Sequence, residues 1–237
     1  MDYSKNTVNS RNPVKRWLHR SRLEASVKLL RLGPRSRVLD YGCGSGELSR
    51  RISKRFPQTQ IVAFDPADDL FSQARHRLAD CPNVLVTREL DMLPGTFDRV
   101  ACLEVLEHLP PVELEAALLD IRVALAADGL CLFTFPIEHG AMSLAKNVYR
   151  ITTGGDPYPS LSSTARAFFG LPVPRQASAN LNDCRYIYSH LGFDCRAMLA
   201  TIGNVFAIED VHVLPLGTVT LGMGNGLAVV ARPRQES

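Results

Sequence analysis

A glycine-rich loop between an expected strand and an expected helix carries the clearest chemical signature in the sequence. Glycine occupies every second position from 42 to 46, directly after a short apolar run that contains Asp40. Glycine lets the backbone turn sharply and lets a ligand approach the main chain without an intervening Cβ atom. The helix after the loop presents unpaired backbone N–H groups in its first turn. At the carboxyl end of a parallel strand, such a loop predicts a site for a nucleotide-like ligand.

The spacing of these glycines discriminates between two ligand classes. Dinucleotide sites use G-x-G-x-x-G and place a pyrophosphate at the helix N-terminus. Here the third spaced position is Glu47, whose carboxylate would repel a pyrophosphate, and Asp40 stands just before the loop. An acidic strand end suits a nucleoside that carries an ammonium group and has no phosphate linker. The pattern therefore favours S-adenosylmethionine.

A second acidic residue, Asp65, ends the next apolar run about 20 residues beyond the loop, where an acidic side chain can bind both ribose hydroxyls. Asp65 followed by Pro66 is, taken alone, better explained as a helix N-cap with proline at the first helical position. Together with the glycine loop, the ribose role is the favoured interpretation.

The elements that must position these residues alternate between strand and helix. Strands are expected at 37–41, 60–65, 83–87, 97–103 and 130–135, and helices at 47–56, 67–79 and 112–127. This alternation predicts an α/β fold of Rossmann-like, doubly wound type. We expect a mostly parallel, seven-stranded sheet with helices on both faces.

The flanking segments complete one expected domain, 1–237, around a cofactor-binding core at 35–136. A basic helix is expected at 14–32, and the irregular segment 140–180, rich in Gly, Pro and Ser, is expected to be a lid over the acceptor. Residues 181–237 should close the fold with a helix at 183–191 and two strands at 192–201 and 226–232.

Five stretches of the core, in order, resemble the class I S-adenosylmethionine-dependent methyltransferases, especially the ubiquinone-biosynthesis and other small-molecule enzymes. They read VLDYGCGSGELS, IVAFDP, ELDMLPGTFDRV, ACLEVLEHLP and LAADGLCLFTFP. The resemblance implies roles by position: the methionine end beside Asp40, the glycine loop and the end of the fourth strand, the ribose at Asp65, and the adenine near Glu89, with Asp91 as the alternative. The implied cofactor-binding residues are Asp40, Gly42, Cys43, Gly44, Asp65, Pro66, Glu89, Leu90, Cys102 and Leu103. Tyr41 departs from the small or apolar residue that is commoner in the family and could narrow the pocket.

Two histidines are candidate general bases for methyl transfer to a hydroxyl group. His108 follows the fourth expected strand, and His139 follows the fifth at the same edge of the sheet. For each, a structural or solvent-facing histidine is the simpler alternative. Glu104 and His108, four residues apart, could pair on one helical turn. No third ligand is apparent beside them, so no metal site is expected.

The acceptor is less constrained than the cofactor. A small-molecule or lipid-linked acceptor, methylated on oxygen, is the favoured hypothesis, and an aromatic-containing lid with a basic helix suits an amphiphilic molecule. An RNA methyltransferase is the alternative, but the Asn/Asp-Pro-Pro-aromatic loop of base-modifying enzymes is replaced here by CLEVLEHL, so nucleic acid is not the expected partner. A non-catalytic S-adenosylmethionine-binding protein is the third hypothesis. The oligomeric state is not readable.

Composition sets the expected cellular context. The net charge of +3 is mild, although seven basic residues and one acidic residue lie between Arg11 and Arg37. That cluster is a solvated helix face or a docking surface for anionic lipid, phosphorylated substrate or RNA. The six cysteines form no C-x-x-C pair, and no apolar run approaches the roughly 20 residues of a membrane span. We expect a cytoplasmic protein with free thiols that could contact a membrane surface.

Overall fold

The fold is built on one seven-stranded sheet in the order β3-β2-β1-β4-β5-β9-β8. The computed structural model describes residues 13–90, 96–138, 164–166, 171, 173, 175, 179–181, 184–215 and 226–234. The strands nearest the N-terminus are β1 (Arg37–Tyr41), β2 (Gln60–Phe64), β3 (Val84–Thr87), β4 (Phe97–Leu103) and β5 (Leu125–Pro136). Each sheet contact among these five is parallel. The sequence-based prediction of a mostly parallel, doubly wound sheet is confirmed.

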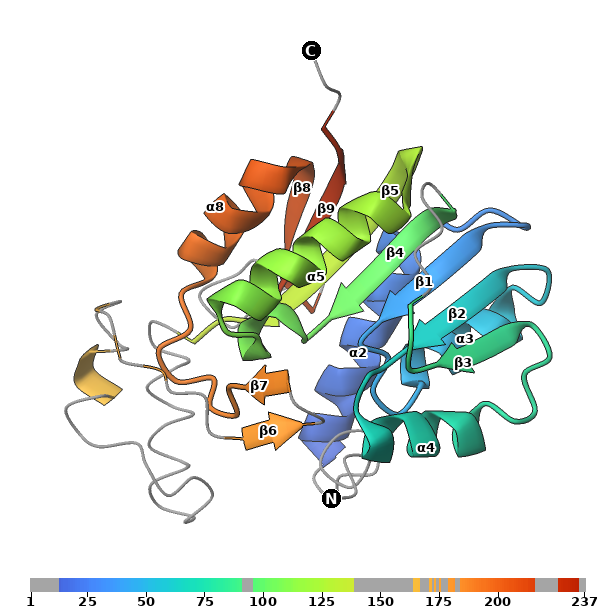
Figure 1. The fold of residues 1–237 in the computed structure, drawn as a ribbon, viewed down its shortest axis with the longest axis horizontal. Coiled ribbons are helices and arrows are strands. Elements are labelled where there is room, and N and C mark those ends of the chain that lie inside the picture. The colour runs from blue at the N-terminus through green and yellow to red at the C-terminus, as the bar shows by residue number, and fades with distance from the viewer. Residues whose placement is uncertain are drawn as a thin grey trace.

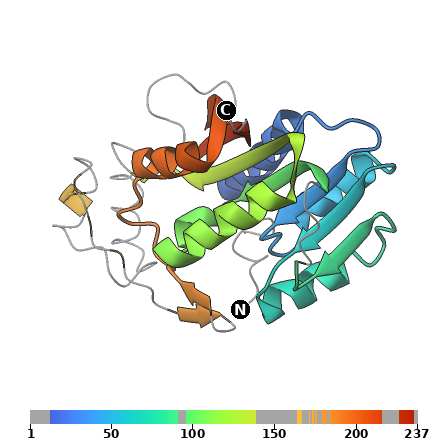
Figure 2. The same ribbon diagram turned by 45° about the horizontal axis from the view of Figure 1, so that its top comes forward.

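Helices cover both faces of this sheet (Figures 1 and 2). Helices α5 (Pro111–Ala124) and α8 (Cys195–Val205) pack on one face, where their apolar residues join those of β4 in one core. Helices α2 (Pro13–Leu29) and α3 (Glu47–Arg55) pack on the other face with a second core. Helix α4 (Asp68–Arg77) lies beside β2 and β3. The central strands β1, β4 and β5 are largely buried between the two helical layers, which explains why their segments read as apolar runs.

The boundary between α5 and β5 lies earlier than the sequence suggests. The helix ends at Ala124, and Leu125 already pairs with Phe97 of β4. The register then shifts, so that Leu130 pairs with Arg99. The predicted strand at 130–135 is therefore the regular half of a longer, irregular strand.

The last part of the chain corrects two expectations. Segment 183–191, expected to be helical, contains β7 (Cys184–Tyr186), which forms a two-stranded antiparallel sheet with β6 (Ala179–Leu181). Segment 192–201, expected to be a strand, begins α8, because the Asp194 carboxylate accepts hydrogen bonds from the N–H groups of Arg196 (2.8 Å) and Ala197 (3.3 Å). This side-chain cap satisfies first-turn donors and starts a helix.

The remaining sheet strands are β8 (Phe206–Leu214) and β9 (Gly226–Pro233). Strand β9 lies between β5 and β8 and is antiparallel to both. The predicted strand at 226–232 is confirmed, and β8 takes the place expected for 192–201. The short helix η1 (Leu106–His108) follows β4 directly. Among the described residues, no helix combines the length and apolar character needed to cross a membrane.

Candidate active site

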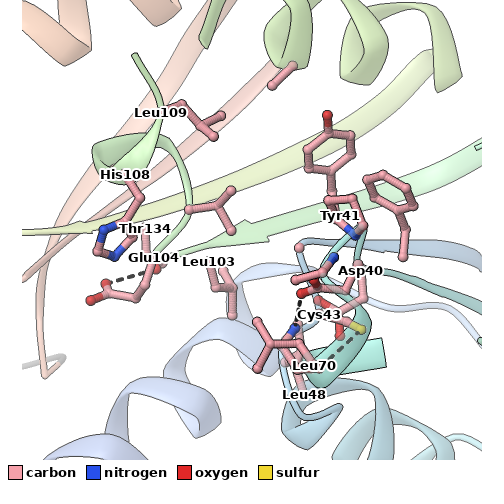
Figure 3. A pocket seen from close by; sticks show the side chains of 18 of the residues that line it. Asp40, Tyr41, Cys43, Leu48, Leu70, Leu103, Glu104, His108, Leu109 and Thr134 are labelled. Carbon is pink, nitrogen blue, oxygen red and sulfur yellow. Dashed lines mark hydrogen bonds between the residues drawn. The ribbon is translucent and has the colours of Figure 1, made fainter. Parts of the chain in front are cut away.

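A cavity of about 410 Å³ lies at the carboxyl ends of the parallel strands. Its walls come from α2, the glycine loop, the ends of β2 and β4, and the short strand β7. Figure 3 shows Leu103 between two groups of polar side chains, one around Asp40 and one formed by Glu104, His108 and Thr134. Ligands of open α/β sheets bind at this edge.

The glycine loop is folded tightly against the end of β2. The N–H groups of Gly42 and Cys43 both donate to the carbonyl oxygen of Phe64, at 2.8 Å each. Gly42 has φ +71°, and a Cβ atom there would lie 2.5 Å from Val105. Gly44 has φ +55°, but a Cβ atom there would meet nothing within 4 Å. Gly42 is therefore required by packing, whereas Gly44 keeps open space beside the cavity for a ligand.

Asp40 is buried beneath this loop. It is 2% exposed and accepts a hydrogen bond of 2.6 Å from the Ser49 hydroxyl on α3. Burial raises the pKa of Asp40 to about 6, against the opposing effect of the Ser49 hydrogen bond. A carboxylate in this position is stabilised by a nearby positive charge, which fits a ligand with an ammonium group.

Asp65 links the end of β2 to the glycine loop. Its two carboxylate oxygens accept hydrogen bonds from the N–H groups of Gly44 (2.8 Å) and Ala67 (3.0 Å). Burial raises its pKa to about 6, although both hydrogen bonds oppose the shift. The N-cap of α4 is Ala67, so Asp65 is not the helix cap that the Asp-Pro pair alone suggests. Each oxygen retains acceptor capacity for a ribose hydroxyl.

The other predicted cofactor residues divide into two groups. Cys43, Pro66 and Leu103 line the cavity beside the residues described above. Cys102, by contrast, is fully buried in the core shared with α5. Glu89 is exposed, and neither Glu89 nor Leu90 is among the described residues of the cavity wall. Asp91, the alternative adenine ligand, lies outside the described residues.

The predicted base His108 lies at the other end of the cavity. Its Nδ1 is 2.8 Å from the carbonyl oxygen of Ile187, and its ring stacks on Tyr186. Burial and the neighbouring His190 lower the pKa of His108 to about 4. The imidazole is therefore neutral at pH 7. The second candidate base, His139, lies outside the described residues.

Glu104 does not form the expected helical pair with His108. It has φ +57°, an uncommon value for a residue with a side chain, and precedes η1 rather than belonging to a helix. Its carboxylate accepts hydrogen bonds from Arg22 Nη1 (2.9 Å) and the Thr134 hydroxyl (3.2 Å). Backbone strain of this kind is concentrated at functional sites.

Side chains of α2 and β7 complete the cavity, and the sequence alone did not assign them. His19 and Arg22 come from α2, and Arg185 and Tyr186 from β7. Burial lowers the pKa of His19 to about 4. The helical spacing of Leu23, Val27 and Leu30 could have indicated the first two, because it defines the face of α2 that turns inward. Nothing in the local pattern of β7 marks it as part of the site.

The chain matches known proteins over its cofactor-binding core. Residues 38–129 match the family described as the methyltransferase domain. The malonyl-[acyl-carrier protein] O-methyltransferase of Geobacter sulfurreducens is 31% identical over 137 residues, which cover 56% of this chain and 50% of that protein. A ubiquinone biosynthesis O-methyltransferase of Xanthomonas campestris is 41% identical over 83 residues, or 32% of this chain and 34% of that protein. The chain thus spans at most half the length of these curated relatives.

Solved structures extend the likeness beyond the core. The N-methyltransferase NodS of Bradyrhizobium japonicum, in complex with S-adenosyl-L-homocysteine, aligns with 95% of this chain and 90% of its own, with a TM-score of 0.57 and 13% identity. This likeness concerns the fold. Together with the matched core and the loop geometry, it supports a class I S-adenosylmethionine-dependent methyltransferase fold with S-adenosylmethionine as the cofactor.

Proposed function

We propose that this chain transfers the methyl group of S-adenosylmethionine to an oxygen atom of a small-molecule or lipid-linked acceptor. The continuity of the cavity is the observation that carries the proposal. One hollow joins the Asp40 and Asp65 end to the Glu104 and His108 end, with Leu103 between them (Figure 3). Residues at one end can thus hold the donor while residues at the other position the acceptor.

The residues at the donor end suit the cofactor chemically. When bound, S-adenosylmethionine supplies a methyl group on a positively charged sulfur, which is a good leaving group. In the proposed complex, Asp40 faces the ammonium end and Asp65 accepts hydrogen bonds from the ribose hydroxyls. The open space at Gly44 admits the ligand to the main chain. Tyr41 and Phe64, whose rings lie 5.0 Å apart, help to exclude water from this end.

The acceptor end combines polar and apolar walls. Val105, Leu109 and Tyr186 offer apolar surface, while Glu104 and His108 offer polar atoms. Such a lining suits an oxygen-bearing group on a larger apolar body. The names of the relatives, both O-methyltransferases, support oxygen as the methylated atom. His108 and His139 remain the predicted candidates for the general base.

The proposal assigns 1–237 to one domain with segment 140–180 as the acceptor lid. This segment follows β5 in the chain and ends within β6, whose partner β7 in a separate two-stranded sheet lines the cavity. An amphiphilic acceptor would also suit contact between the basic helix and a membrane surface from the cytoplasm. Replacing 140–163 with a short Gly-Ser linker should abolish methylation and leave cofactor affinity nearly unchanged. Equal losses of both would contradict the lid role.

The decisive experiment separates cofactor binding from acceptor choice. Calorimetry with S-adenosylhomocysteine tests the donor end of the cavity. Absence of binding would refute the proposed use of S-adenosylmethionine as methyl donor. Incubation with methyl-labelled S-adenosylmethionine and fractionated cell extract then tests the acceptor end. Label should enter lipid or small-molecule fractions and remain attached as a methyl ether or ester. Label confined to RNA would overturn the proposed acceptor class and establish the RNA alternative.

A further inference from the structure

A second group of ionisable side chains lies directly behind the acceptor end of the cavity. Glu107, His108 and His190 bring one carboxylate oxygen and two imidazole nitrogens within 4.8 Å of one another. The first two residues belong to η1, and His190 belongs to the loop between β7 and α8. Glu107 and His108 are adjacent in the sequence, whereas His190 is brought to them by the fold.

The Glu107 carboxylate has no hydrogen-bond partner among the described residues. Its side chain is fully buried, and neither carboxylate oxygen has a hydrogen-bond donor there. The His108 Nε2 atom lies 3.7 Å from Glu107 Oε1, beyond hydrogen-bond distance. A buried, unpaired carboxylate is strongly unfavourable unless a cation or a proton neutralises it. Its position beside two imidazoles points to a cation.

The orientation of His108 fits the role of a ligand. A carbonyl oxygen can only accept, so the 2.8 Å contact with Ile187 requires the proton on Nδ1. The lone pair of Nε2 then faces the Glu107 carboxylate. Histidines that bind metals hold their second ring nitrogen in this way against a carbonyl or carboxylate group.

Backbone contacts hold the loop that carries His190 against η1. The N–H of Ile187 donates to the carbonyl oxygen of His108 at 2.8 Å. Arg175 Nη2 donates to the carbonyl oxygens of Glu107 (2.7 Å) and Ser189 (2.8 Å). These hydrogen bonds hold the backbone of η1 and the backbone of the β7–α8 loop in fixed positions relative to each other, as a binding site requires.

We propose that Glu107, His108 and His190 form a site for one divalent transition-metal ion of the Zn²⁺ or Mn²⁺ class. Two imidazoles and one carboxylate suit such ions, whereas Mg²⁺ and Ca²⁺ prefer oxygen ligands. Three protein ligands leave coordination positions open. His108 also lines the cavity, so an open position can receive an oxygen atom of the acceptor. That last role rests on the proposed function and makes His108 a ligand rather than a base, whereas the site itself does not depend on methyl transfer.

Metal titration of the tag-free full chain tests the site. After dialysis against EDTA, the chain should bind one equivalent of Zn²⁺ or Mn²⁺ by calorimetry, and Mg²⁺ more weakly. Co²⁺ should give visible absorption bands that report nitrogen coordination. Binding of S-adenosylhomocysteine, measured on the same sample, distinguishes failure of this site from failure of the cofactor site. Absence of stoichiometric binding by Zn²⁺, Mn²⁺ and Co²⁺ would overturn the proposal.

Two variants and one control locate the bound ion. Glu107→Gln and His190→Ala should each weaken metal affinity by at least about tenfold, while His76→Ala on the exposed face of α4 should not. In EDTA, Glu107→Gln should unfold at the same or a higher temperature than the unaltered chain, because the neutral amide replaces a carboxyl group whose charged form is disfavoured by burial and by Glu104. Added Zn²⁺ should raise the unfolding temperature of the unaltered chain only. Unchanged affinity in both variants, or an equal loss of thermal stability with and without metal, would show that the cluster is structural only.

Discussion

Arg22 on α2 donates a hydrogen bond from Nη1 to Oε2 of Glu104, 2.9 Å away and 82 residues further along the chain. The two side chains are each 24% exposed, and both line the cavity. Burial alone would raise the pKa of Glu104, but Arg22, His190 and the Thr134 hydroxyl outweigh burial and lower it. This pair therefore joins the N-terminal helix to the end of the fourth strand and keeps the carboxylate ionised.

Removal of the Arg22 charge should destabilise the fold. We expect Arg22→Gln to lower the free energy of unfolding by about 1–3 kcal/mol, because hydrogen bonds to charged groups contribute about that much. Urea unfolding measures the change. Arg20→Gln, on the exposed side of the same helix, is the matched control and should change little. Equal effects of both substitutions would show that Arg22 affects stability only through the net charge of the protein and not through its hydrogen bond to Glu104.

Asp65 should be required for cofactor affinity more than for folding. Asp65→Asn keeps the size of the side chain, but its amide group cannot accept from both Gly44 and Ala67 as the carboxylate does. We expect affinity for S-adenosylhomocysteine to fall by about 10–100-fold, the equivalent of one or two charged hydrogen bonds. Calorimetry with Asp69→Asn, on the exposed start of α4, is the control. Unimpaired affinity in Asp65→Asn would remove the ribose role.

Two alanine substitutions in the glycine loop should have different consequences. Both positions have left-handed backbone, which costs about 1–2 kcal/mol for alanine. Gly42→Ala adds a clash with Val105 and should cost about 1–3 kcal/mol more, part of which Val105→Ala should restore. Gly44→Ala meets no protein atom and should mainly weaken cofactor binding. Thermal unfolding and calorimetry separate the two effects, and identical behaviour of the two variants would contradict the assignment.

The stability of the cofactor-free chain should depend on pH through Asp40. Its pKa in the folded state is raised to about 6, so the folded state binds its proton more tightly than the unfolded state does. The resulting stabilisation is complete below about pH 4 and is lost as the pH rises through about 6. We expect Asp40→Asn to match the unaltered chain near pH 4 and to exceed it at pH 7 by roughly 2–3 kcal/mol. Urea unfolding at both values checks this, and a difference independent of pH would contradict it.

Local sequence patterns predicted the cofactor-binding core because each of its elements is determined by residues that lie close together in the sequence. Each parallel strand is a short apolar run, each following helix has its own periodicity, and the glycine spacing marks the loop. The error at 183–201 has a physical origin. β7 exists through pairing with β6, a partner that strand periodicity does not reveal. The start of α8 was readable in principle, since Asp194 precedes good helix formers.

The acceptor end was not predictable for a different reason. Arg22, Tyr186 and His190 reach it from elements far apart in sequence, and only tertiary contacts bring them to His108. His190, the third residue of the proposed metal site, is such a residue. Site residues contributed by one strand and its loop can be inferred from a motif, whereas those collected from several elements require the fold.

The antiparallel course of β9 has a practical consequence for handling the protein. Because β9 runs opposite to β5, its final residues lie beside the starts of the parallel strands, at the end of the molecule away from the cavity (Figure 1). Helix α2, by contrast, places His19 and Arg22 in the cavity wall within its first three turns. A fluorophore, affinity handle or surface linkage attached after Pro233 should therefore leave the cavity undisturbed, whereas the same group on the first turns of α2 would share a helix with residues of the cavity wall.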